Sequence, residues 1–236
     1  MAPCHMPIKL SISRSMPDSS ANSQTARMAS YGDRFPTILD EVAALKRERT
    51  IEAAAQLFYE RGYEKTTLEA VADQLGVTKP FIYLHFKSKA ELLAEICSRG
   101  VRASLQALDA AMALDASPTR KLEQLSRDFL TVVLNHQRHI AILTREEKSL
   151  EPHDFQRLSS ERRAFDSKLA QLLMDGVKAG DFVVSDPNVA SLAIGGLVSW
   201  AYIWYRPHGR LSLDALADEV TGLVLAMVGV APRARR

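Results

Sequence analysis

The sequence has few cysteines and no recognisable catalytic or phosphate-binding motif. Cys4 and Cys97 are the only cysteines among 236 residues, so no CxxC pair, disulfide framework or zinc site is indicated. That usage fits a reducing cytosol, where we expect the protein to reside. Glycine-rich phosphate loops and GxSxG motifs are missing. We therefore expect no cofactor and no enzymatic activity, with an enzyme or carrier that uses an apolar C-terminal cavity as the alternative class.

Long apolar runs are also scarce, which argues against a membrane protein. Residues 189–205 are apolar nearly all round, but a membrane span needs roughly 20 such residues. A helix without a polar face must be covered on every side, so we expect residues 189–205 to form one buried helix. Gly195 and Gly196 would let another helix approach closely, or would only add local flexibility. Together with a last helix over residues 213–227, this helix would form a four-helix homodimer interface.

Acidic residues are missing from a short stretch that carries three lysines. The formal net charge is +2, and the excess lies in residues 44–104, which hold 10 basic and 8 acidic side chains. Within them, residues 74–90 carry Lys79, Lys87 and Lys89 and no acidic residue. Such a patch suits a surface that faces phosphates, although a solvated face with a few lysines would look the same.

Helical periodicity runs through most of the chain, and no convincing alternation typical of strands occurs. The fold class predicted is all-α. Residues 1–40, rich in Ser, Pro, Met and Asn, are expected to be a disordered extension. We divide the rest into an N-terminal helical domain over residues 41–104, a larger helical domain over residues 105–230, and a basic tail over residues 231–236.

The DNA-binding assignment starts from a helix-turn-helix pattern over residues 67–86. Thr66 with Glu69 three residues later predicts a capping box that opens one helix. Gly76 supplies the left-handed position that ends it. A second, short helix follows Thr78, with Pro80 in its first turn, where a missing N–H costs nothing.

The second helix of such a motif enters the major groove with its N-terminal residues towards base edges. A lysine there can donate to guanine or to a phosphate, and Pro or Phe can pack against a thymine methyl group. Tyrosine and histidine side chains can reach phosphates, and helix starts bind anions. Phe81 could instead be a surface aromatic, and His85 a structural histidine. The candidate DNA-binding residues are Thr67, Thr78, Lys79, Pro80, Phe81, Tyr83, His85 and Lys89.

The stretch "TTLEAVADQLGVTKPFIYLHFKSKAELL", residues 66–93, resembles the N-terminal domain of the TetR family of transcriptional regulators. Pro80, Phe81 and Leu84 depart from the family pattern, so no operator sequence is carried over. The resemblance implies a homodimeric, ligand-responsive repressor released from double-stranded DNA at a palindromic operator by a hydrophobic or acyl-CoA-type effector. It assigns DNA binding to residues 41–104, and effector binding and dimerisation to residues 105–230. A nucleoid-associated or division-linked relative without an inducer is the alternative. The matching residues are Thr66, Thr67, Ala72, Gly76, Val77, Thr78, Lys79, Tyr83, His85, Phe86, Lys89 and Leu92.

A shorter resemblance bears on the effector. "WYRPHGRLS", residues 204–212, is similar to a loop of TetR members that respond to acyl-CoA thioesters. The resemblance and the cations available for phosphates give the candidate ligand-binding residues Arg145, Arg162, Trp200, Trp204 and Arg206. The alternative is that Arg206 caps the helix ending there and Trp204 lies in the core. His136 and His139 are expected to be solvated or capping histidines rather than metal ligands.

Overall fold

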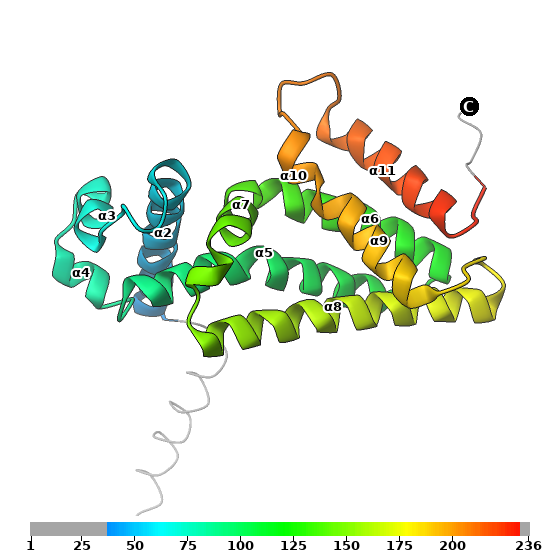
Figure 1. Cartoon of the computed structure of the whole chain (residues 1–236), viewed down its shortest axis with the longest axis horizontal. Helices are drawn as coiled ribbons and strands as arrows, with labels where there is room; N and C mark the ends of the chain where they lie inside the picture. The colour runs from blue at the N-terminus through cyan, green and yellow to red at the C-terminus, as the bar shows by residue number, and fades with distance from the viewer. Residues whose placement is uncertain (1–36, 232–236) are drawn as a thin grey trace, which may run out of the picture. The chain divides into compact units, whose positions relative to one another are not determined.

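The computed structural model describes residues 37–231, which form helices and no strand (Figure 1). The all-α prediction is confirmed. Most of the expected extension and basic tail lies outside the described residues. Residues 38–40, expected in the extension, are already helical, because the first long helix begins at Ile38 rather than near Glu41.

The helices break where the sequence places caps, prolines and left-handed glycines. Ser117, Asp186 and Ser212 each accept a backbone N–H at a helix start, and Gly62 and Gly180 have positive φ angles after helix ends. The elements are α2 (Ile38–Arg61), α3 (Leu68–Leu75), α4 (Lys79–Tyr83), α5 (Lys89–Met112), α6 (Pro118–Asn135), α7 (Gln137–Glu146), η1 (Glu147–Ser149), α8 (Pro152–Ala179), α9 (Pro187–Ser199), α10 (Ala201–Trp204) and α11 (Leu213–Met227).

The first turns of α2 belong to a unit distinct from the one formed by residue 47 onward. They start with a local cap in which the Thr37 hydroxyl donates to Asp40 Oδ2 at 2.7 Å. The Asp40 N–H donates back to Thr37 Oγ1 at 3.3 Å. This reciprocal pair satisfies one of the free N–H groups at the helix start.

From residue 47 onward, two hydrophobic clusters hold the helices together. One joins α2, α3, α4 and the start of α5, and includes the fully buried Ile51, Phe58 and Ile82. The other joins α6, α8, α9 and α11 with the C-terminal part of α5. Because α5 contributes to both clusters, and runs alongside α8 (Figure 1), it links the short helices to the rest of the fold.

The expected single helix over residues 189–205 is wrong. The run divides into α9 and α10, with the break at Trp200, whose N–H donates to Gly196 O at 3.1 Å. An unbroken apolar run carries no periodicity that could reveal this break. Nor is the run covered on every side within the chain, because Val189 and Leu192 are 61% and 59% exposed.

Candidate functional site

The helix-turn-helix is built as the sequence predicts, with one correction at its start. The N-cap of α3 is Thr67, whose Oγ1 accepts the Ala70 N–H at 3.1 Å, and not Thr66. The Thr66 side chain is buried, and its hydroxyl donates to the carbonyls of Leu57 and Gly62. Thr66 therefore fastens the loop after α2 instead of capping α3, and the predicted capping box does not form.

The turn between α3 and α4 consists of residues 76–78. Gly76 has φ +66°, a conformation that favours glycine, and the Val77 N–H reaches back to Ala72 O at 3.0 Å. Thr78 is the N-cap of α4, and Pro80 lies in its first turn, as predicted. The turn thereby fixes the direction in which the short second helix leaves the first.

The leading end of α4 points into solvent while its middle is anchored. Thr78, Lys79 and Pro80 are exposed, whereas Ile82 on the same helix is fully buried. A helix of five residues has little stability of its own. Burial of Ile82, worth about 1.5–3 kcal/mol, therefore helps to hold the exposed end in place.

The aromatic residues of this segment divide into two kinds. Tyr83 is 48% exposed, consistent with the predicted contact to DNA. Phe81 is half-buried, packs against the cluster around Ile82, and stands edge-to-face with His85 at a centroid distance of 5.3 Å. The contact rigidifies both rings, so Phe81 and His85 also support the shape of α4.

Lys79 has an ionic partner within the chain. Its ammonium group pairs with the carboxylate of Glu69 on α3 and lies 5.9 Å from the centre of the Tyr83 ring. The hydrogen bond between them raises the pKa of Lys79 and lowers that of Glu69, so both groups are charged at neutral pH. A DNA phosphate or base that binds Lys79 competes with Glu69 for its ammonium group.

Lys89, predicted to form part of an anion site at a helix start, has several partners within the chain. It opens α5, but its Nζ donates to the carbonyls of Tyr63, Glu64 and Thr66 at 3.0, 3.4 and 3.1 Å. It also lies 4.2 Å from the centre of the Tyr63 ring. An ammonium group has three N–H donors, so this geometry favours a role in holding the loop before α3.

A shallow hollow of about 380 Å³ nevertheless brings Thr67, Tyr83 and Lys89 together with Lys87 and Ser88. Ser88 caps α5, since its Oγ accepts the Glu91 N–H at 3.0 Å. Lys87 is exposed beside that cap and is absent from the predicted DNA-binding residues, although it lies in the stretch without acidic residues.

The structure gathers three of the five predicted ligand-binding residues around one hollow of about 930 Å³, which we call the basic hollow. Arg145, Trp200 and Arg206 line it, and so do Arg138 and Glu52, which the sequence did not single out. Besides Glu52, no other carboxylate lies among the described residues of its wall. The basic hollow thus combines three guanidinium groups with one carboxylate.

A second hollow of about 440 Å³, the apolar hollow, lies next to it. Arg162 is on its wall, and Trp200, Thr144 and Tyr202 line both hollows. The Tyr202 hydroxyl donates to Thr144 Oγ1 at 3.1 Å on this shared wall. The rest of the lining is mostly apolar and includes Phe129, Val133, Ile140, Leu143, Phe165 and Leu192.

The predicted arginines are engaged with partners of the chain. Arg206 Nη1 donates to the carbonyls of Ile203 and Tyr205 at 3.0 Å, so Arg206 caps α10 while also lining the basic hollow. Arg145 Nη2 donates to the Tyr59 carbonyl at 3.0 Å, and Arg162 pairs with Glu147 at 2.6 Å. Each still has N–H groups left for a ligand, because a guanidinium carries five.

Trp204 is 50% exposed, so it is not a core residue. It lines a smaller hollow of about 280 Å³ together with Arg206, rather than the two larger ones. His139 also differs from expectation, because it is buried rather than solvated. Among residues 37–231, no group of three or more His, Cys, Asp or Glu side chains could hold a metal ion.

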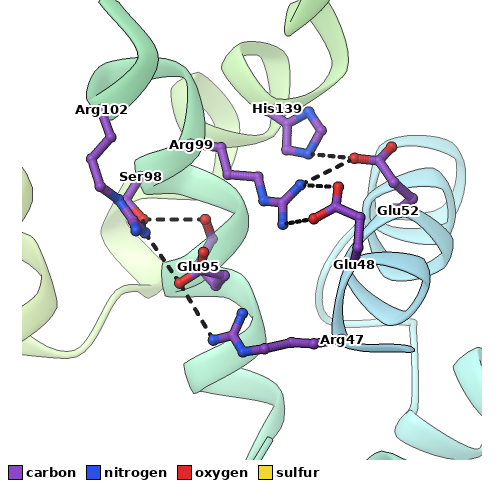
Figure 2. Close-up of polar contacts among 8 residues, drawn as sticks. All are labelled: Arg47, Glu48, Glu52, Glu95, Ser98, Arg99, Arg102 and His139. Carbon is purple, nitrogen blue, oxygen red and sulfur yellow. Dashed lines mark hydrogen bonds and ion pairs between the residues drawn. The ribbon is translucent and has the colours of Figure 1, made fainter. Parts of the chain in front are cut away.

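A polar network ties α2 to α5 (Figure 2). Both terminal nitrogens of Arg99 bind the two carboxylate oxygens of Glu48, which lowers the pKa of Glu48. Glu95 Oε2 forms ion pairs with Arg47 Nη2 at 3.6 Å and with Arg102 Nη2 at 3.1 Å. Two-pronged arginine–carboxylate contacts are the strongest of their kind, so this network fixes the position of α2 against α5.

Comparison with known proteins identifies the family. The N-terminal part, residues 51–96, matches the family described as "Bacterial regulatory proteins, tetR family", and residues 115–228 match "Tetracyclin repressor-like, C-terminal domain". The HTH-type transcriptional repressor KstR2 of Rhodococcus jostii is 31% identical over 76% of this chain and 89% of its own length. The chain belongs to the TetR family. It is therefore a DNA-binding transcriptional regulator, as its N-terminal motif suggests.

Solved structures of the family agree with this fold. A tetR-family regulatory protein from Rhodococcus RHA1 has a TM-score of 0.72 and 28% identity, and the match covers 79% of this chain and 98% of that one. AibR, solved in complex with isovaleryl coenzyme A and operator DNA, has a TM-score of 0.66 and 25% identity, with 75% and 97% covered. In the described part of this chain, no helix meets the length and apolarity needed to cross a membrane.

Proposed function

We propose that this protein is a homodimeric, cytoplasmic repressor that binds a palindromic operator through α4 and leaves it when a CoA thioester binds. The observation that carries the DNA-binding half is the exposed leading end of α4, with Thr78, Lys79 and Pro80 outward and Ile82 anchored. In this proposal residues 41–104 bind DNA, and residues 105–230 bind the effector and dimerise.

Exposed apolar side chains on α9 and α11 support the dimer. Val189 and Leu192 of α9 are 61% and 59% exposed, and Leu223 and Met227 of α11 are 55% and 41% exposed. Side chains of this kind rarely gather on a free surface. Pairing of α9 and α11 across a two-fold axis would cover them, and two α4 helices about 34–36 Å apart would then fit successive major grooves.

The adjoining hollows support an effector that is anionic at one end and apolar at the other. Arg138, Arg145 and Arg206 of the basic hollow suit phosphate groups, which guanidinium binds with two parallel hydrogen bonds. The apolar hollow of about 440 Å³ suits an acyl group. A CoA thioester has both ends, and AibR, a structural neighbour, has been solved with isovaleryl coenzyme A.

Fluorescence anisotropy with DNA from upstream of the protein's own gene tests both halves. Titrations with isovaleryl-CoA, palmitoyl-CoA, cyclohexanecarboxyl-CoA and free CoA would be run at several salt concentrations. We expect specific binding that at least one thioester abolishes and free CoA does not. Specific binding that no thioester affects would refute the effector class and leave the regulator in place.

A further inference from the structure

Glu52 connects a helix of the N-terminal cluster with the basic hollow. It belongs to α2, and its side chain lines the basic hollow. Basic groups from two other helices surround its carboxylate: Arg99 Nη1 of α5 at 3.5 Å, His139 Nε2 of α7 at 3.3 Å, and Arg138 Nη1 of α7 at 3.9 Å. Figure 2 shows Arg99 and His139 directed at Glu52.

The charge around Glu52 is finely balanced. Burial lowers the pKa of His139 to about 4, so its imidazole is neutral at pH 7 and adds no positive charge. Its Nε2 atom has no hydrogen-bond partner with acceptable geometry. Arg99 gives its shorter contacts to Glu48. Glu52 therefore depends on two longer contacts, to Arg99 and Arg138, of which Arg138 also faces the hollow.

Movement of α2 would reach the DNA-binding helices directly. Ile51 and Phe58 of α2 are fully buried in the same cluster as Val71 of α3 and Ile82 of α4. Close-packed interiors transmit displacement because they contain little free space. A displacement of Glu52 and α2 would therefore also shift the exposed end of α4.

We propose that Glu52 couples the basic hollow to DNA binding: an anion held there by Arg138 and Arg145 repels the Glu52 carboxylate, takes Arg138 from it, and loosens α2 from α7. This inference rests on the proposed function and adds its regulation. It predicts antagonism between anion and DNA, and such coupling is reciprocal by thermodynamic necessity. A variant with a neutral side chain at position 52 would bind the anion at least as tightly, but anion binding would no longer weaken its DNA binding.

Glu52→Gln tests the coupling, with Glu60→Gln as the matched control. Glu60 is another carboxylate of α2; it accepts a hydrogen bond from Gln56 at 3.0 Å and does not line the basic hollow. Gln is isosteric with Glu, and the Glu52 side chain is 43% exposed, so the variant keeps its packing. Thermal melting and DNA binding without thioester would verify folding.

Two readouts separate ligand binding from coupling. Binding of isovaleryl-CoA, palmitoyl-CoA or cyclohexanecarboxyl-CoA is followed by tryptophan fluorescence, because the chain has two tryptophans and Trp200 lines both hollows. DNA release is followed by anisotropy. We expect a thioester to weaken DNA binding at least tenfold in the wild type and in Glu60→Gln. In Glu52→Gln the same thioester should bind equally or more tightly and weaken DNA binding less than twofold.

Three outcomes overturn the coupling proposal, and they are distinguishable. Equal release in Glu52→Gln and wild type contradicts the role of Glu52 and leaves the proposed function intact. A thioester that binds the wild type without releasing DNA contradicts coupling but not ligand binding. No fluorescence change with any thioester in the wild type contradicts the proposed effector class and the coupling with it.

Discussion

Replacement of Lys79 by Ala is expected to weaken DNA binding by an amount that follows from its place on α4. Lys79 lies at the exposed leading end, with its side chain 45% exposed, where its ammonium can reach a phosphate. Each phosphate that a cation neutralises adds about 0.9 to the slope of log affinity against log salt, which corresponds to about fivefold in affinity at 0.15 M salt. Because the proposed dimer carries Lys79 twice, Lys79→Ala should bind about 30-fold more weakly.

Glu69 supplies the converse prediction. In the free protein it holds the Lys79 ammonium, and it is 54% exposed beside the exposed leading end of α4. Glu69→Gln removes both a competitor for Lys79 and a charge that repels phosphates, so we expect it to tighten DNA binding.

Anisotropy titrations of the wild type, both single variants and the double variant, at 0.05–0.3 M salt on cognate and scrambled DNA, would test both predictions. Weaker binding of Lys79→Ala to both DNAs indicates a phosphate contact, whereas weaker binding to cognate DNA alone indicates a base contact. In the Lys79→Ala background the gain from Glu69→Gln should shrink, since part of it acts through Lys79. Unchanged affinity and salt slope in Lys79→Ala would refute the reasoning about α4.

Three further predictions concern stability and assembly. Gly176→Ala should destabilise by about 1–3 kcal/mol in denaturant melts, because its Cβ would lie 1.9 Å from the Phe182 ring, whereas Gly196→Ala, with nothing within 4 Å, should not; equal melts would contradict this. Burial lowers the pKa of His139 to about 4 in the folded protein, whereas an unfolded histidine titrates near 6.5. The free energy of unfolding should therefore fall by about 3 kcal/mol as the pH falls from 6.5 to 4. His139→Gln should lack this loss, and an identical pH profile of stability in the variant would contradict the prediction. Leu223 lies on the exposed part of α11 that the proposed dimer covers, so Leu223→Glu should give monomers in sedimentation; a dimeric Leu223→Glu variant would contradict this interface.

Local chemistry made the helix-turn-helix predictable from sequence. Gly76, Thr78 and Pro80 each have one conformational consequence, and together they fix the turn and the start of α4. The sequence pattern places the N-cap of α3 one residue early because Thr66 and Thr67 are both suitable cap residues. Only the tertiary contacts of the Thr66 hydroxyl, with Leu57 and Gly62, decide between them.

Contacts between distant segments could not be predicted in this way. Lys89 donates to the carbonyls of Tyr63 and Thr66, which lie more than 20 residues earlier in the chain. No periodicity in the sequence predicts such a contact. The same holds for Glu52, whose importance depends on the fold that places it beside Arg138 and His139. For Arg206 the sequence offered a helix cap or a ligand-binding residue as alternatives. The two are compatible, because Arg206 caps α10 and also lines the basic hollow.

The most direct test of the central claim is a comparison of affinities for two DNA fragments of equal length at 0.15 M salt. One is the sequence upstream of the protein's own gene, and the other is its scrambled counterpart. The account predicts a preference of at least about 10³-fold for the first, and its loss when Thr78, Lys79 and Pro80 are replaced by alanine. Equal affinity for both fragments in the wild type, or an undiminished preference in the triple variant, would contradict it.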